Sequence, residues 1–128
     1  SFSGLKSAVI NVLHTASQRG ETLVAADVAA SFQEAVVDIL AEKALQALQQ
    51  CKVPSLVLSG GVAANSCLRN ELERRCQSAG FRFYSPDTVL CTDNAAMIGC
   101  RAYYQLQAGD IADLRLNAIP GLPLGGKR

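Results

Sequence analysis

An apolar run that leads directly into two glycines and then a helix is the feature that most constrains this chain. Pro54 cannot continue a helix, and the Ser-Leu-Val-Leu sequence of residues 55–58 predicts a strand buried on both faces. Ser59-Gly60-Gly61 follows at once. Asn65 then stands where it would cap a helix running to about Ala79. The chain therefore contains a strand, a glycine turn and a helix in immediate succession.

Two longer helices are predicted before this junction, because apolar residues recur there at three- and four-residue steps. The first covers Leu5 to Ala16, and the second runs from about Ala26 to Gln50. Gly20 separates them, as expected of a glycine that ends a helix. After the junction, Leu68, Leu72 and Cys76 form the predicted inward stripe of the third helix.

The second half of the chain continues with a strand over 81–84 and a last helix over 94–107. This order predicts an α/β domain with a small, mixed central sheet packed against long helices. Because two short strands do not make a stable parallel sheet alone, further strands are expected from Val89–Leu90, from a partner or from chain outside this sequence. Residues from Asn117 onward, with Pro120 and Pro123, are predicted to be an extended or disordered tail.

Composition limits the class of protein. With 128 residues, 49% hydrophobic and 18% charged, the chain can bury one core, and general disorder is excluded. The net charge of +1 is too small to hold nucleic acid by charge alone. No apolar stretch reaches a membrane span, so a soluble protein is expected. The only methionine is Met97, which indicates that Ser1 is no natural start and favours a segment of something longer over a processed chain.

The five cysteines form no CxxC pair. They are predicted to be small buried hydrophobes in a reducing compartment. A cysteine nucleophile is set aside, since no histidine lies near Cys67 or Cys91 in the sequence. The cysteines are Cys51, Cys67, Cys76, Cys91 and Cys100.

The glycine junction has two interpretations. Glycines between a strand and a helix let the backbone approach a phosphate or ribose, so the segment suits a nucleotide. It matches neither GxGxxG nor the P-loop, and a tight turn followed by a plain cap at Asn65 explains it equally well. Asp93, at the start of the last helix, is likewise either a cap or a carboxylate that binds a metal ion or a substrate hydroxyl.

Other charged residues favour structural roles. His14 is expected at the core or its edge. Lys6 could face a phosphate, but an exposed lysine in a first helical turn is the favoured interpretation. Four arginines are interleaved with Glu71 and Glu73, which favours a solvated face over an RNA surface. These arginines are Arg69, Arg74, Arg75 and Arg82.

Three segments together resemble one known family, that of the tRNA adenosine threonylcarbamoyltransferases, formerly called O-sialoglycoprotein endopeptidases. The likeness extends to about Gly109 but represents only the C-terminal two-fifths of a full family member, and the short tail is similar to the bacterial branch. The segments are Phe2-Ser3-Gly4-Leu5-Lys6, Leu56 to Asn65 with Leu68-Arg69, and Leu90 to Ile98.

The resemblance implies an ASKHA fold (actin, sugar kinase, Hsp70-like) of two lobes that hold a nucleotide between them. Residues 1–116 would be the C-terminal lobe and 117–128 the tail. The family moves the threonylcarbamoyl group from threonylcarbamoyl-adenylate to N6 of the tRNA adenosine next to the anticodon, releasing AMP. The segment alone is expected to be inactive.

The resemblance also assigns residues. Asn65 would contact the adenylate nucleoside, and Asp93 would be one ligand of a divalent metal, with iron expected and zinc or magnesium as alternatives. The family's HxxxH ligand pair belongs to the earlier lobe, and His14 is the only histidine here. No catalytic base is identified. The loop residues implied to line the pocket for threonylcarbamoyl-adenylate or ATP are Ser59, Gly60, Gly61, Val62 and Ala63.

The partners implied are tRNA, a paralogous ASKHA subunit, a small ATPase subunit and the N-terminal lobe, in the cytoplasm and without a membrane. A different class of function is also open, in which the segment is a non-catalytic nucleotide-binding or dimerisation lobe that scaffolds tRNA-modification partners. Another ASKHA enzyme, such as a sugar kinase or carbamoyltransferase, would need a different first lobe.

Overall fold

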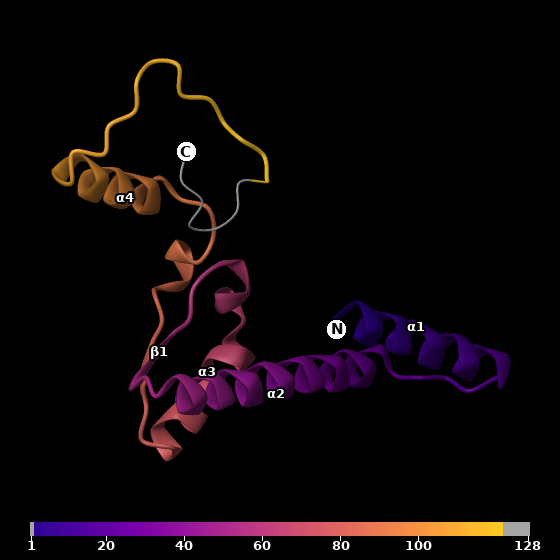
Figure 1. The fold of residues 1–128 in the computed structure, drawn as a ribbon. Coiled ribbons are helices and arrows are strands. Elements are labelled where there is room, and N and C mark those ends of the chain that lie inside the picture. Colours follow the sequence, from indigo (N-terminus) through magenta and orange to yellow (C-terminus); the bar gives the residue numbers. More distant parts are fainter. Residues whose placement is uncertain (1, 122–128) are drawn as a thin grey trace. The chain divides into compact units, whose positions relative to one another are not determined.

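The computed structural model describes residues 2–121 and is predominantly helical, with one small sheet (Figure 1). It divides into two compact units, one ending at Asp93 and the other beginning at Asn94. The elements in chain order are α1 (Phe2–Gln18), α2 (Ala25–Cys51), β1 (Ser55–Val57), the 3₁₀ helix η1 (Gly61–Ala64), α3 (Ser66–Ser78), β2 (Arg82–Tyr84), the 3₁₀ helix η2 (Thr88–Leu90) and α4 (Ala95–Gln107).

All four predicted α-helices are present, and glycine marks the end of three. Gly20, Gly80 and Gly109 have positive φ angles and follow α1, α3 and α4 closely. The end of α2 is different, because Lys52 takes the left-handed conformation and donates its N–H to the carbonyl of Gln49. A left-handed residue therefore ends each helix even where glycine is absent.

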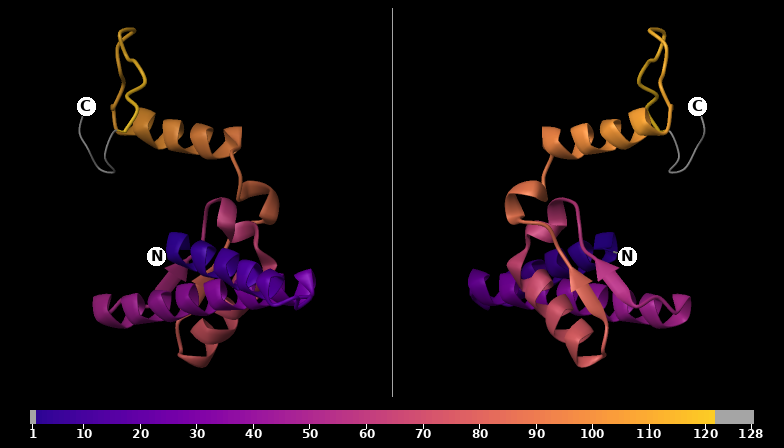
Figure 2. Two further views of the ribbon diagram at one scale, coloured as in Figure 1. Left: turned by 90° about the vertical axis from the view of Figure 1, so that its right-hand side faces the viewer. Right: turned by 90° about the vertical axis from the view of Figure 1, so that its left-hand side faces the viewer.

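The sheet is a parallel pair of β1 and β2, with Leu56 opposite Phe83. The described sheet is thus parallel and not mixed. Parallel strands need a crossover connection, and α3 provides it. The expected third strand at Val89–Leu90 is wrong, since these residues lie in η2. Figure 2 shows the two strands side by side beside α3.

The core lies between α2, α3 and one face of this sheet. The predicted stripe of α3 is confirmed, since Leu68, Leu72 and Cys76 are all buried. Leu68 and Leu72 meet Val37 and Ala41 of α2. The prediction of a strand buried on both faces is wrong, because Val57 is 68% exposed. Among the helices of residues 2–121, α2 and α3 pack against the face that carries Leu56, Leu58 and Phe83.

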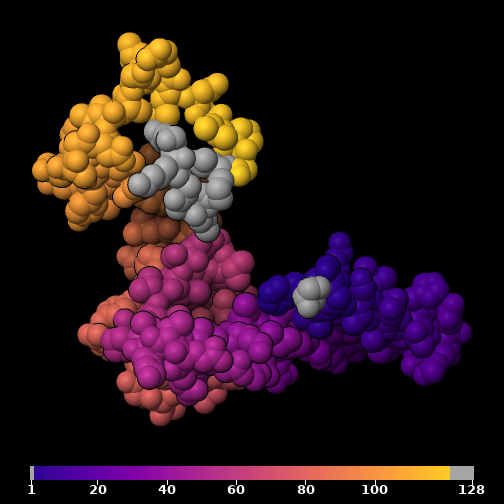
Figure 3. Space-filling view, in the orientation of Figure 1, coloured from indigo at the N-terminus to yellow at the C-terminus, as the bar shows by residue number. Residues whose placement is uncertain are grey.

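Helix α1 packs along the first half of α2, as Figures 1 and 3 show for the indigo and purple segments. Ala16 is its only buried residue among those described, and Val12 and Leu13 remain exposed. No helix within residues 2–121 is long and apolar enough to cross a membrane.

The unit beginning at Asn94 contains α4, none of whose residues is buried. Tyr103 and Tyr104 make an edge-to-face contact with ring centroids 5.5 Å apart. Cys100 on α4 and Cys51 at the end of α2 are exposed, so the prediction of five buried cysteines is wrong for these two. The prediction is confirmed for Cys76 and Cys91, which are buried, whereas Cys67 is half-buried.

A cluster of charges joins α2 to α3. Glu71 accepts hydrogen bonds from Arg74 at 2.6 and 2.8 Å and from Arg75 at 2.6 Å, and Arg75 also pairs with Asp38 of α2. The hydrogen bond from Arg74, followed by that from Arg75, lowers the pKa of the Glu71 carboxyl from 4.5 to about 2.

This lowered pKa predicts an acid-dependent loss of stability. A carboxylate whose pKa is lower in the folded state stabilises the fold above its unfolded pKa of about 4.5 and loses that contribution as the pH falls toward about 2. We expect Glu71→Gln to remove part of this slope, measured as urea midpoints between about pH 5 and pH 3. The matched control is Glu73→Gln, since Glu73 is exposed on the same helix. An equal slope in wild type and Glu71→Gln would contradict the prediction.

Candidate functional site

The glycine loop lies where β1 ends and α3 is about to begin. The N–H of Leu58 donates to the carbonyl of Tyr84 at 2.9 Å, which is the last bond between the two strands' segments before the loop. Gly60 then takes φ +90°. A Cβ at Gly60 would meet no atom within 4 Å, so this glycine is required by its backbone conformation and not by lack of room.

The loop predicted to line a nucleotide pocket is divided by burial. Ser59, Gly60 and Gly61 are exposed, and Val62 is 66% exposed. Ala63 is fully buried, so its side chain belongs to the core. The first four residues are therefore accessible to a ligand, whereas the side chain of Ala63 is not.

Asn65 caps α3 as predicted. Its Oδ1 accepts a hydrogen bond from the N–H of Leu68 at 2.9 Å, and its Nδ2 donates to Oε1 of Gln33 on α2 at 3.2 Å. An amide nitrogen carries two hydrogens, and one of those on Nδ2 is donated to Gln33. Asn65 thus fixes the start of α3 against α2. Asn65 is half-buried beside the loop, and its Nδ2 carries a second hydrogen.

Two neighbouring hollows adjoin the loop. One, of about 270 Å³, is lined by Val62 and Asn65 together with Phe32 and Gln33 of α2. The other, of about 410 Å³, has mostly apolar walls and includes Ser59, Val62 and Ala63. A third hollow, of about 780 Å³, lies elsewhere between α2 and α3, and none of the predicted site residues lines it.

Asp93 is exposed in the segment that follows η2. It does not cap α4, because the Oδ1 of Asn94 accepts the N–H of Met97 at 2.9 Å. The cap interpretation of Asp93 is therefore wrong. Across residues 2–121, no group of three or more His, Cys, Asp and Glu side chains is arranged to hold a metal ion. Asp93 can supply one carboxylate ligand, and the described residues do not complete a metal site.

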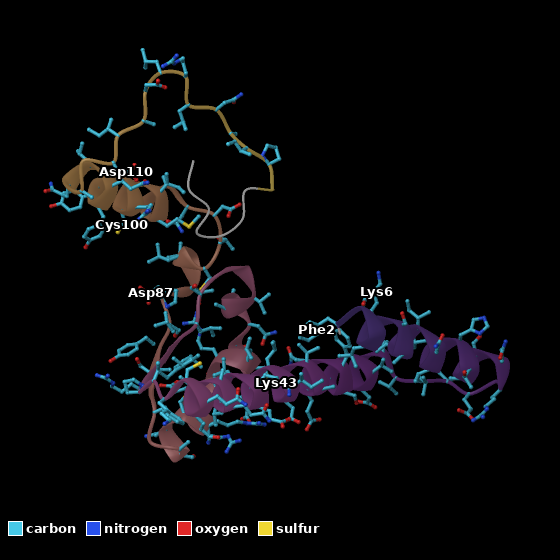
Figure 4. All side chains as sticks on the ribbon, viewed as in Figure 1. Phe2, Lys6, Lys43, Asp87, Cys100 and Asp110 are labelled. Carbon is cyan, nitrogen blue, oxygen red and sulfur yellow. The ribbon has the colours of Figure 1, made fainter. Side chains whose placement is uncertain are left out.

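The remaining polar candidates lie away from the loop. Lys6 is exposed, as predicted, and points away from α2 in Figure 4. His14 is exposed on α1, so the expected position at the core or its edge is wrong.

Arg69 is the residue that sequence reasoning misassigned. It is half-buried and not part of a solvated face. Its guanidinium donates to the carbonyl of Ala63, to the hydroxyl of Ser85, to the carbonyl of Pro86 and to the sulfur of Cys91. A signal was available, because long side chains in a first helical turn extend back toward the helix start.

An α/β unit with a glycine turn between a strand and a capped helix is a common frame for binding nucleotides. The comparisons make the class specific. The family model described as tRNA N6-adenosine threonylcarbamoyltransferase matches residues 1–100. The chain belongs to this family.

Curated relatives carry the same name. The chain is 58% identical over 124 residues to the tRNA N6-adenosine threonylcarbamoyltransferase of Moorella thermoacetica, and 56% identical to that of Desulfitobacterium hafniense. Each alignment covers 97% of this chain and 36% of the relative. The protein of Caldicellulosiruptor saccharolyticus is 49% identical, in an alignment that covers 100% of this chain and 38% of that relative. The chain therefore spans a little over a third of the length of these relatives.

Proposed function

We propose that the full-length protein transfers the threonylcarbamoyl group from threonylcarbamoyl-adenylate to N6 of the tRNA adenosine next to the anticodon, releasing AMP. This chain would be the C-terminal lobe of an ASKHA fold. The observation that carries the proposal is the family match over residues 1–100, which includes the whole of the strand, glycine loop and capped helix.

Three groups of residues have proposed roles. Ser59, Gly60, Gly61 and Val62 present an accessible loop to the adenylate, with the backbone of Ala63 behind them. The second Nδ2 hydrogen of Asn65 would bind a nucleoside hydroxyl. Asp93 would be one ligand of a divalent metal, whose bound form supplies Lewis-acid stabilisation of the carbamoyl carbonyl or of phosphate. One carboxylate does not hold iron, zinc or magnesium alone, so the other ligands of the metal would come from the rest of the protein.

The proposal extends to partners. It requires tRNA as acceptor substrate and the N-terminal lobe as the second wall of the pocket, since a nucleotide held between lobes needs both. A paralogous ASKHA subunit and a small ATPase subunit would complete the modification machinery in the cytoplasm. A lobe that only scaffolds these partners would bind them without needing Asn65 or Asp93, which makes the two functions separable.

Asn65 provides the test. In the full-length protein, Asn65→Ala should cost about 1 kcal/mol of stability through the lost cap and should also weaken nucleotide binding. Asn65→Asp keeps an N-cap acceptor, removes both N–H donors and adds negative charge near a phosphate. It should therefore stay closer to the wild-type melting temperature than Asn65→Ala does, yet bind the nucleotide about tenfold more weakly, near the upper value of one net hydrogen bond.

The measurements are calorimetric titration with ATP or threonylcarbamoyl-adenylate and transfer to unmodified tRNA. Gln33→Ala is a matched control, because it removes the partner of Nδ2 while leaving the Asn65 amide in place. Affinity and transfer unchanged within twofold in Asn65→Asp would leave Asn65 with the cap alone and would favour the scaffolding function.

A further inference from the structure

The side chain of Arg69 connects two segments that are far apart in the sequence. Its Nη2 donates to the carbonyl oxygen of Ala63 at 2.9 Å, at the end of the glycine loop. Its Nη1 donates to Ser85 Oγ at 2.9 Å and to the carbonyl oxygen of Pro86 at 2.7 Å. Nη2 also lies 3.3 Å from the sulfur of buried Cys91.

These acceptors belong to the two stretches of chain that carry the proposed ligands. Ala63 follows directly after the accessible loop residues, whereas Ser85, Pro86 and Cys91 lie on the path from β2 to Asp93. Both stretches lie outside the α-helices and strands, and the turns from Ala63 to Gly60 and from Leu90 to Asp87 are each closed within one stretch and do not link the two. Four acceptors on one guanidinium supply that link, and hydrogen bonds to a charged donor are the stronger class.

The base of this link is rigid. Arg69 lies in the first turn of α3, where its N–H donates to the carbonyl of Asn65 at 3.1 Å, and Asn65 caps the helix. A planar guanidinium can serve acceptors on two sides at once, which a single ammonium cannot do with the same geometry. The arrangement therefore depends on an arginine and not only on a positive charge.

We propose that Arg69 is a positioning residue that holds the glycine loop and the segment leading to Asp93 in one fixed arrangement, and so sets the nucleotide loop relative to the metal ligand. The ligands named here rest on the proposed function. The coupling of the two segments rests on the contacts alone.

Hydrogen–deuterium exchange of the full-length protein without ligand tests the coupling. In Arg69→Gln, amide exchange should rise together in residues 60–64 and 85–92, by about tenfold or more. Arg69→Lys should resemble Arg69→Gln, because charge without the planar fork does not restore the contacts. Arg74→Gln is the matched control, since Arg74 is 64% exposed on the same helix, and it should leave both segments unchanged.

A general loss of stability must be separated from this effect. Leu72→Val reduces packing in the core beneath α3 without touching any acceptor of Arg69, and it should raise exchange across the core without singling out the two segments.

Millimolar guanidinium chloride, but not sodium chloride, should slow exchange in both segments of Arg69→Ala. Should the arginine variants fold poorly, Ser85→Ala removes one acceptor and should give a smaller rise in the same two segments.

Ligand binding provides the second readout. Nucleotide affinity and metal content should both fall in Arg69→Gln and remain unchanged in Arg74→Gln. Faster exchange in only one of the two segments, or wild-type affinity in Arg69→Gln, would overturn the proposal. If the wild-type protein itself binds neither nucleotide nor metal, the proposed function fails, and the exchange experiment still decides whether Arg69 couples the segments.

Discussion

Asp93→Ala in the full-length protein is expected to lose its bound metal while keeping its stability. The carboxylate is exposed and takes no part in capping α4, because Asn94 accepts the N–H of Met97. Removing the side chain therefore should leave the fold intact. Loss of an outer-shell partner already costs roughly 10- to 100-fold in metal affinity, so the loss of a charged ligand should exceed that range.

Asp87→Ala is the matched control for this substitution. Asp87 lies in the same segment after β2 (Figure 4), and the structure assigns it no side-chain cap on η2. Its backbone carbonyl, which accepts the N–H of Leu90, is retained in the variant. Metal per protein molecule, measured by mass spectrometry, should fall for Asp93→Ala and not for Asp87→Ala. Wild-type stoichiometry in both variants would remove Asp93 from the ligand set.

Residues 1–128 alone are expected to transfer no threonylcarbamoyl group and to bind nucleotide weakly. Within the described residues no metal cluster exists, and Asp93 is a single ligand. The loop offers one wall of a pocket. Large apolar side chains such as Val57, Val62 and Ile98 are exposed, so self-association of the isolated segment is expected as well.

The experiment compares the purified segment with the full-length protein, each supplied with metal, threonylcarbamoyl-adenylate and unmodified tRNA. Circular dichroism verifies that the segment retains its helices, and light scattering measures self-association. Adding the separately expressed N-terminal part should restore some transfer, because it returns the missing wall and ligands. Transfer by the segment alone at a rate comparable with the full-length protein would mean that it contains catalytic groups not identified above.

The local parts of the fold could be predicted from the sequence because their signals are local. The cap at Asn65, the stripe of Leu68, Leu72 and Cys76, and the glycine at the end of α3 all act within a few residues. The exposure of Val57 could not be predicted this way, since it depends on how many layers cover the sheet.

The candidate site was predictable only in part for the same reason. The loop sequence marks Gly60 as a turn residue, and the structure gives it the positive φ that a glycine tolerates. The four acceptors of Arg69 come from two separate stretches of the chain, and neighbouring glutamates made a solvated face the better interpretation. A helical spacing cannot reveal partners that only the tertiary fold brings close.

The parallel pairing of β1 and β2 also determines the order in which this part of the chain can fold. Ser55 pairs with Arg82, and all of α3 lies between them, so the strands meet only after the crossover has been closed. During synthesis β1 leaves the ribosome well before β2. Until β2 follows, the backbone N–H and C=O groups of β1 can pair with strands of other chains. The glycine loop lies between β1 and the crossover helix α3, so it reaches its final conformation only after β2 has paired with β1.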